Sequence, residues 1–89
     1  MRVNIPAPLR SYTGLAPVIE SEGATLAEVL SNIERRYPGF RFRIIDEQDG
    51  IREHITIFVN EEMAPNLTVL VRSGDTIHII CALSGGKRK

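Results

Sequence analysis

The sequence lacks the features that mark exported, membrane-spanning and metal-binding proteins. Its single cysteine, Cys81, has no second thiol in the chain for a disulfide, and residues 1–6 contain no apolar run typical of a signal peptide. No apolar stretch approaches the roughly 20 residues that a membrane-spanning helix needs. The two histidines, His54 and His78, belong to neither a Cys-x-x-Cys nor a His-Glu-x-x-His pattern. We therefore expect a cytoplasmic protein without metal or membrane partner, with both histidines facing solvent.

The chain also lacks net charge, because 11 acidic residues balance 11 basic ones. Three of the basic residues, Lys87, Arg88 and Lys89, end the sequence, and the remainder has 8 basic and 11 acidic residues, a net charge of −3. A mildly acidic body is a poor surface for phosphate groups, and three cations are too few for a nucleic-acid-binding arm. We expect no nucleic-acid partner.

The size and composition are those of a single globular domain. The chain has 89 residues, of which 43% are hydrophobic and 25% are charged, and it contains no internal repeat and no linker between two domains. We expect one domain over residues 1–83, followed by a flexible C-terminal tail with two glycines over residues 84–89.

The clearest secondary-structure pattern predicts a helix after Thr25. Thr25 and Glu28 have the spacing of a capping box, in which the hydroxyl accepts from an amide of the first turn and the carboxylate reaches back to the amide of Thr25. Pro38 and Gly39 are expected to end the helix. The apolar residues between them follow helical spacing and form one stripe: Leu26, Val29, Leu30, Ile33 and Tyr37.

Strand patterns lie on both sides of this helix. Residues 3–5 alternate between apolar and polar side chains, residues 9–12 are expected to resume the strand after two prolines, and residues 15–20 read as a second strand. The first 20 residues therefore predict a β-hairpin.

After the helix, residues 40–50 predict a short strand or turn that leads into a loop. Residues 55–59 are β-branched and aromatic and predict a strand, residues 67–71 are ambiguous, and residues 76–83 predict the last strand. This order predicts an α+β domain with a mixed sheet packed on one main helix, for which the β-grasp (ubiquitin-like) arrangement is the natural candidate.

The body of the chain offers no catalytic constellation. Its acidic residues stand in polar loop segments, its glycines show no phosphate-loop spacing, and Cys81 in an apolar strand resembles a small core residue. The chemistry is therefore expected at Ser84-Gly85-Gly86, just after the last strand. Glycine has no Cβ, so a Gly-Gly segment can thread a terminal carboxylate into the active site of another enzyme. The alternative is an interaction domain whose Gly-Gly is only a flexible end.

Several stretches, in this order and spacing, resemble the MoaD/ThiS family of small β-grasp sulfur carriers. Within that family the likeness is greatest to the CysO-like carriers of an actinobacterial type of cysteine biosynthesis. The matching stretches are residues 4–6, 9–10, 13–14, 23–26, 57–61, 74–79 and 82–86.

The resemblance implies a carrier with no catalytic site of its own and no bound cofactor. Gly86 would be adenylated by an E1-like adenylyltransferase that uses ATP, and then converted to a thiocarboxylate that donates sulfur in cysteine, cofactor or metabolite biosynthesis. Gly85 and Ser84 would thread through partner tunnels, and Leu83, Phe58 and Ile80 would form the docking surface. The implied partners are the E1-like enzyme and a sulfur-acceptor enzyme, here a pyridoxal-phosphate (PLP)-dependent cysteine synthase.

Two features depart from the family pattern. Cys81 stands where such carriers often have proline, and Lys87, Arg88 and Lys89 follow the second glycine. The Gly86 carbonyl is therefore part of an amide bond, which cannot be adenylated as a carboxylate is. The resemblance implies removal of the last three residues by a JAMM-type zinc metallopeptidase, which activates water at its metal.

Two other functions need the same Gly-Gly. The chain could be a ubiquitin-like modifier joined through Gly86 to lysines of target proteins. It could also be the small subunit of molybdopterin synthase, in which the tail enters a large catalytic subunit. The sequence leaves both open.

Overall fold

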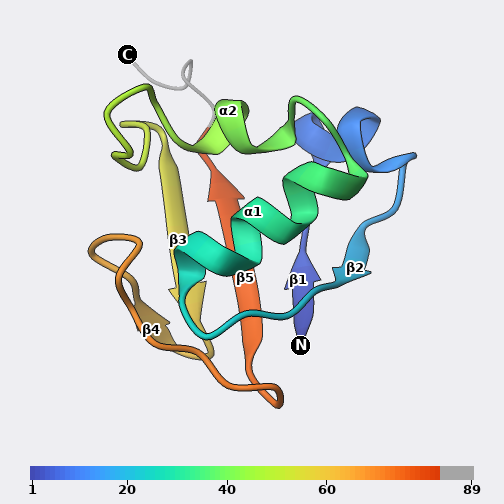
Figure 1. The fold of residues 1–89 in the computed structure, drawn as a ribbon. Helices are drawn as coiled ribbons and strands as arrows, with labels where there is room; N and C mark the ends of the chain where they lie inside the picture. The colour runs from blue at the N-terminus through green and yellow to red at the C-terminus, as the bar shows by residue number, and fades with distance from the viewer. Residues whose placement is uncertain (83–89) are drawn as a thin grey trace.

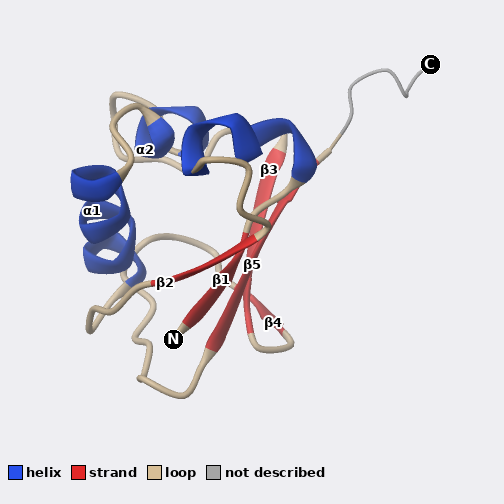
Figure 2. Ribbon diagram, turned by 90° about the vertical axis from the view of Figure 1, so that its right-hand side faces the viewer, coloured by secondary structure: helices blue, strands red, loops and turns tan. Residues whose placement is uncertain are grey.

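The computed structural model describes residues 1–82. It shows a five-stranded mixed sheet with helices on one face (Figures 1 and 2). Helix α1 packs across that face, while α2 and a 3-10 helix, η1, lie toward the end of the sheet at which β5 terminates. The elements in chain order are β1 (Arg2–Asn4), η1 (Ala7–Thr13), β2 (Val18–Glu20), α1 (Leu26–Arg36), α2 (Phe40–Ile44), β3 (Ile55–Val59), β4 (Glu62–Met63) and β5 (Thr76–Cys81).

The last strand in the sequence is the central strand of the sheet. The strand order is β2-β1-β5-β3-β4, with β5 parallel to β1 and antiparallel to β3. The register pairs Val3 with Ile77 and Ile57 with Ile79. This mixed sheet with its main helix confirms the predicted β-grasp fold.

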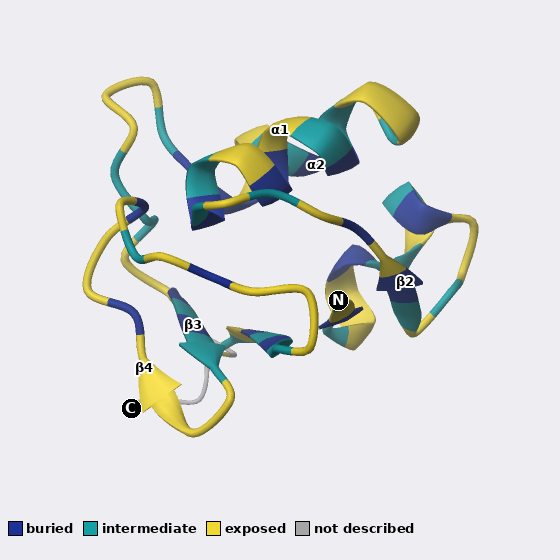
Figure 3. Cartoon of the chain, turned by 60° about the horizontal axis from the view of Figure 1, so that its bottom comes forward, coloured by how far each residue is buried: buried dark blue, intermediate teal, exposed yellow. Residues whose placement is uncertain are grey.

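The core lies between α1 and the sheet. Along β5 and β3 the side chains alternate between the two faces, and the inward-facing isoleucines Ile57, Ile77 and Ile79 are buried. Figure 3 shows buried segments, in dark blue, on α1 and along β3. The predicted stripe on α1 is also buried over Leu26, Val29, Leu30 and Ile33. Burying each such side chain contributes on the order of 1.5–3 kcal/mol, which makes this interface the main source of stability.

The capping box at the start of α1 forms with one difference from the prediction. The Glu28 amide donates to Thr25 Oγ1 at 3.2 Å, as expected, but the Glu28 carboxylate accepts from the amide of Ala24, at 2.9 Å, and not from that of Thr25. The amides of Leu26 and Ala27 donate to the carbonyls of Val69 and Leu67. The ambiguous segment 67–71 is thus no strand; it supplies acceptors for amides that a helix start leaves free.

The predicted strand over residues 9–12 is wrong. Strands β1 and β2 do pair antiparallel, but between them η1 begins after Pro6 and carries Pro8 near its start. Proline cannot donate to a strand ladder, and its fixed φ suits the first turn of a helix. Gly14, with φ of 64°, ends the turn in the left-handed region.

The predicted strand or turn at the start of residues 40–50 is also wrong, because residues 40–44 form α2. Phe40 and Ile44 lie one turn apart and are both buried. The Glu34 carboxylate, from α1, accepts from the amides of Gly39 at 2.8 Å and Arg41 at 2.9 Å. A carboxylate at a helix start satisfies free amides there, so α2 is capped by a tertiary contact that no local pattern signals.

The strand that was predicted over residues 76–83 is observed as Thr76–Cys81, and Leu83 lies outside the described residues.

We predict that Glu34→Gln lowers the free energy of unfolding at pH 7. The two amide bonds hold the Glu34 pKa below its ordinary value of 4.5, so the carboxylate stabilises the fold above that pH and loses this effect as the pH falls through the lowered pKa. The stability difference between wild type and Glu34→Gln should therefore shrink in acid. Urea unfolding from pH 7 to pH 3 measures it, with the exposed loop variant Glu47→Gln as control. A difference that is constant with pH would contradict this role.

Candidate functional site

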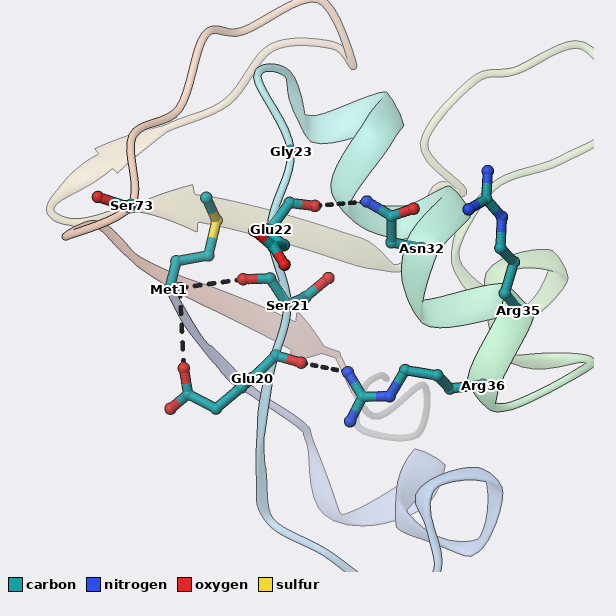
Figure 4. Close-up of a pocket in the computed structure, with 9 residues that line it drawn as sticks. All are labelled: Met1, Glu20, Ser21, Glu22, Gly23, Asn32, Arg35, Arg36 and Ser73. Carbon is teal, nitrogen blue, oxygen red and sulfur yellow. Dashed lines mark hydrogen bonds and ion pairs between the residues drawn. The ribbon is translucent and has the colours of Figure 1, made fainter.

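One hollow in the described part of the chain lies where α1 is bonded to the segment that precedes it (Figure 4). It has a volume of about 710 Å³ and lies between α1 and the segment after β2. Asn32 donates to the Glu22 carbonyl at 2.7 Å, and Arg36 donates to the Glu20 carbonyl. These bonds fasten α1 to the chain that leads into it, so the polar groups are engaged in holding the fold together.

Other signs of catalytic or membrane chemistry are also missing from residues 1–82. Within this part of the chain, no three or more histidine, cysteine, aspartate or glutamate residues are grouped so that they could hold a metal ion. None of its helices is long and apolar enough to cross a membrane.

The face of the sheet opposite α1 carries the predicted docking residues. Phe58 pairs with His78, and Thr56 pairs with Ile80, across β3 and β5. Because their neighbours in both strands point into the core, these four side chains lie on the open face. Phe58 is half-buried and Ile80 is 47% exposed. The structure thus brings Phe58 and Ile80 to one face of adjacent strands.

A shallow groove of about 630 Å³ runs along this open face. Two of its lining residues, Asn4 and His78, form a hydrogen bond between β1 and β5, with Asn4 Nδ2 and His78 Nδ1 2.8 Å apart. His78 is half-buried but lies on the open face, as predicted for a solvent-facing residue, and His54 is exposed as predicted. Met63, the partner of Phe58 on β4, extends the apolar surface with 62% exposure. The open face therefore combines apolar side chains with one polar pair.

The end of β5 determines where the Gly-Gly segment is attached. Cys81 pairs with Ile55 and packs, half-buried, at the edge of the core. The amide of Ala82 donates to the His54 carbonyl at 2.9 Å, so the sheet holds the chain up to its last described residue. The remaining predicted site residues lie outside the described residues: Leu83, Ser84, Gly85, Gly86, Lys87, Arg88 and Lys89.

The opposite end of β5 is held by Asn60, which sequence reasoning did not single out. Asn60 has φ of 57°, in the left-handed region that asparagine tolerates better than most residues. Its Nδ2 donates to Asp75 at 3.0 Å, and its Oδ1 accepts from the Thr76 amide at 3.0 Å. The bond from Asn60, and one from the Arg72 amide, lower the Asp75 pKa. This network positions the first residue of β5.

These features define a ubiquitin-like β-grasp protein, in whose sequence the Gly-Gly pair follows the central strand with three residues between them. Comparison with known proteins then gives the family: the ThiS family model matches residues 3–86. The chain belongs to the ThiS family.

Its relatives are sulfur carriers and modifiers. It is 33% identical, over 94% of this chain and 96% of the relative, to the sulfur carrier protein CysO of Mycobacterium tuberculosis. It superimposes on a chain in the BexX/CysO complex of Amycolatopsis orientalis with TM-score 0.89 and 34% identity, covering 96% of this chain and 98% of that one. The small archaeal modifier protein 1 of Methanosarcina acetivorans gives TM-score 0.79 and 26% identity, with 96% and 94% covered.

We predict that Asn60→Ala destabilises the fold by about 1–2 kcal/mol, because it removes two hydrogen bonds and places alanine at a positive φ. Asn60→Gly, which tolerates this φ, should lose less, and the neighbouring exposed variant Glu61→Ala should remain close to wild type. Urea unfolding distinguishes the three. Equal stability of Asn60→Ala and Glu61→Ala would refute the anchoring role.

Proposed function

We propose that the chain is a sulfur carrier whose reactive group is the carboxylate of Gly86, freed by removal of Lys87, Arg88 and Lys89. The observation that carries this proposal is the family match, which covers residues 3–86 and ends at the second glycine. The similarity to CysO sulfur carriers over nearly the whole chain supports it. On this account the protein is a co-substrate for other enzymes and has no catalytic site of its own.

The chemistry proceeds in two steps on an E1-like adenylyltransferase. The Gly86 carboxylate attacks the α-phosphorus of ATP, which releases pyrophosphate and leaves an acyl-adenylate. Hydrosulfide then attacks the acyl carbon and expels AMP, and loss of its proton leaves the thiocarboxylate. ATP is bound and consumed by the partner, and the carrier itself holds no cofactor. The glycine pair suits this role because Gly85 and Gly86, with Ser84, present no large side chain to a narrow channel.

Maturation is a necessary part of the proposal. In the sequence as given, the Gly86 carbonyl forms a peptide bond to Lys87. A JAMM-type zinc metallopeptidase would hydrolyse that bond, with a metal-bound water as the nucleophile.

The acceptor of the sulfur is proposed from the CysO relatives: a PLP-dependent cysteine synthase in the cytoplasm. The open face of the sheet would dock partners through Phe58 and Ile80, together with Leu83. Exposed apolar side chains on a small domain suit such a contact. Ile80 is 47% exposed and adjoins Phe58 across the β3–β5 pairing, which supports this assignment.

A second candidate function is protein modification through Gly86. It is favoured by the similarity to small archaeal modifier protein 1, at 26% identity over 96% of this chain. A modifier uses the same adenylation but transfers the acyl group to a lysine amine instead of to sulfur. Conjugates linked through Gly86 in a cell lysate would support it.

We predict that pyrophosphate is released from ATP when a form of the protein ending at Gly86 is incubated with ATP and the E1-like enzyme of its own organism. With sulfide present, this form should gain the mass of one sulfur for one oxygen. The 89-residue chain should do neither, because its glycine carbonyl is an amide, and a form ending at Gly85 should react poorly because its carboxylate lies one residue short. Mass spectrometry and a pyrophosphate assay measure both steps. Equal reaction of the 89-residue chain would contradict the proposal.

A further inference from the structure

An exposed aromatic side chain lies at the end of the sheet where β5 terminates. In α2, Phe40 and Ile44 are buried in the core, whereas Phe42 between them is 53% exposed. Phe42 therefore leaves much of its apolar ring in contact with solvent, although a phenylalanine side chain gains much from burial.

The Phe42 ring is held in place by an arginine from the following loop. The Arg52 guanidinium carbon lies 4.5 Å from the centre of the Phe42 ring, and Arg52 Nε donates to the Phe42 carbonyl at 2.8 Å. A cation over an aromatic face is attractive, and the backbone bond fixes the guanidinium there. The pair forms a pre-organised surface with an aromatic and a cationic group side by side.

This pair borders a groove at the root of the Gly-Gly segment. The groove has a volume of about 310 Å³ and is lined by Pro8, Leu9, Phe42, Arg43, Arg52, His54, Ile55 and Cys81. Cys81 is the last residue of β5, and the following amide, of Ala82, is bonded to the His54 carbonyl. Phe42 and Arg43 of α2 thus line the same groove as the last residue of β5. Because Cys81 lines the groove, an enzyme that contacts the chain where β5 ends would lie close to it.

The groove is basic although the body of the protein is mildly acidic. Its lining contains Arg43, Arg52 and His54 and no carboxylate. Two acids of the nearby loop have other partners: Asp49 pairs with Arg41 at 3.1 Å, and Asp46 accepts from the amides of Gln48 and Gly50. These amide bonds lower the Asp46 pKa, with a smaller contribution from Arg52. The exposed Glu53 is the remaining acid beside the groove in sequence.

We propose that Phe42, Arg43 and Arg52 form a docking element for an acidic rim around the channel of the adenylating enzyme. Phe42 would insert into an apolar recess of that rim, and the two guanidinium groups would pair with its carboxylates. Aromatic residues and arginine are the types enriched at binding hot spots, and charge complementarity favours association of the correct partner. The inference rests on the proposed function, because that function brings the enzyme to this end of the sheet.

The test compares two charge reversals that are identical in chemistry but different in place. Arg43→Glu alters the groove, whereas Arg35→Glu alters an exposed arginine of α1 that lines the separate hollow beside β2. Phe42→Ala is paired in the same way with Leu70→Ala, which removes another exposed apolar side chain, 76% exposed. Thermal unfolding confirms that each variant is folded, which is expected because all four side chains are exposed or outside the core.

Binding to the E1-like enzyme is measured by calorimetry at low and high salt, both for the 89-residue chain and for the form ending at Gly86. Arg43→Glu and Phe42→Ala should each raise Kd by about tenfold or more, and the two controls should stay within about twofold. The effect of Arg43→Glu should diminish at high salt, because screening weakens exposed ion pairs.

Equal Kd values for Arg43→Glu and Arg35→Glu, or for Phe42→Ala and Leu70→Ala, would overturn the docking element. The variants could show the expected differences in Kd while the wild-type form ending at Gly86 yields no pyrophosphate from ATP. That result would refute the proposed function and support the docking element. No measurable binding of the wild type in either form would overturn both. The outcomes therefore separate the two proposals.

Discussion

The pairing of β5 with both β1 and β3 is the constraint on which the rest of the structure depends. This strand comes last in the sequence yet lies at the centre of the sheet, parallel to β1 and antiparallel to β3. Its inward residues, Ile77 and Ile79, complete the core beneath α1, so the sheet cannot close until the end of the chain is in place. The residues after β5 are thus attached to a strand that is paired on both sides. The position of Cys81 relative to the open face is therefore fixed by the sheet. The proposed function would use this consequence of the topology, because it requires the terminus to reach the active site of another enzyme.

Around this centre, short irregular segments are held by carboxylates and amides at their ends. Glu34 caps α2, Asp46 closes the turn before Gly50, and Asp75 is bonded at the start of β5. In each case hydrogen bonds to the ionised carboxylate lower its pKa. A domain of this size has a thin core. Such local contacts therefore contribute a larger share of its stability than they would in a bigger protein. All three groups lose their charge in acid, and the fold should weaken there.

The parts of the fold that were predicted from the sequence are those with strong local patterns. The Thr25–Glu28 capping box, the apolar stripe of α1 and the β-branched run of β3 are readable without tertiary information, and together with strand order they gave the β-grasp fold. The errors at residues 9–12 and 40–44 have a different origin. In the first, two prolines favour a helical turn over a strand; in the second, the cap comes from Glu34 on another helix.

Some residues of the candidate site could likewise be predicted from the sequence, and others could not. Gly86 and its neighbours could be named from composition and order alone, and they remain predictions. The family resemblance implied Phe58 and Ile80 as docking residues, and the register of β3 and β5 shows that they lie on one face of the sheet. Phe42 was missed, and with it its contact with Arg52, because an aromatic residue in a short apolar stretch predicts a core position for that residue. Its exposure follows only from the direction that α2 takes over the end of the sheet, which depends on tertiary contacts.

The central claim is that Gly86 becomes a terminal carboxylate and then a thiocarboxylate. The most direct test is the intact mass of the protein isolated from its native cells, with no enzyme added. The account predicts a species that ends at Gly86, of which a fraction has sulfur in place of one oxygen. If only the mass of the 89-residue chain is found under conditions in which the sulfur-containing product is being made, the carrier account is contradicted.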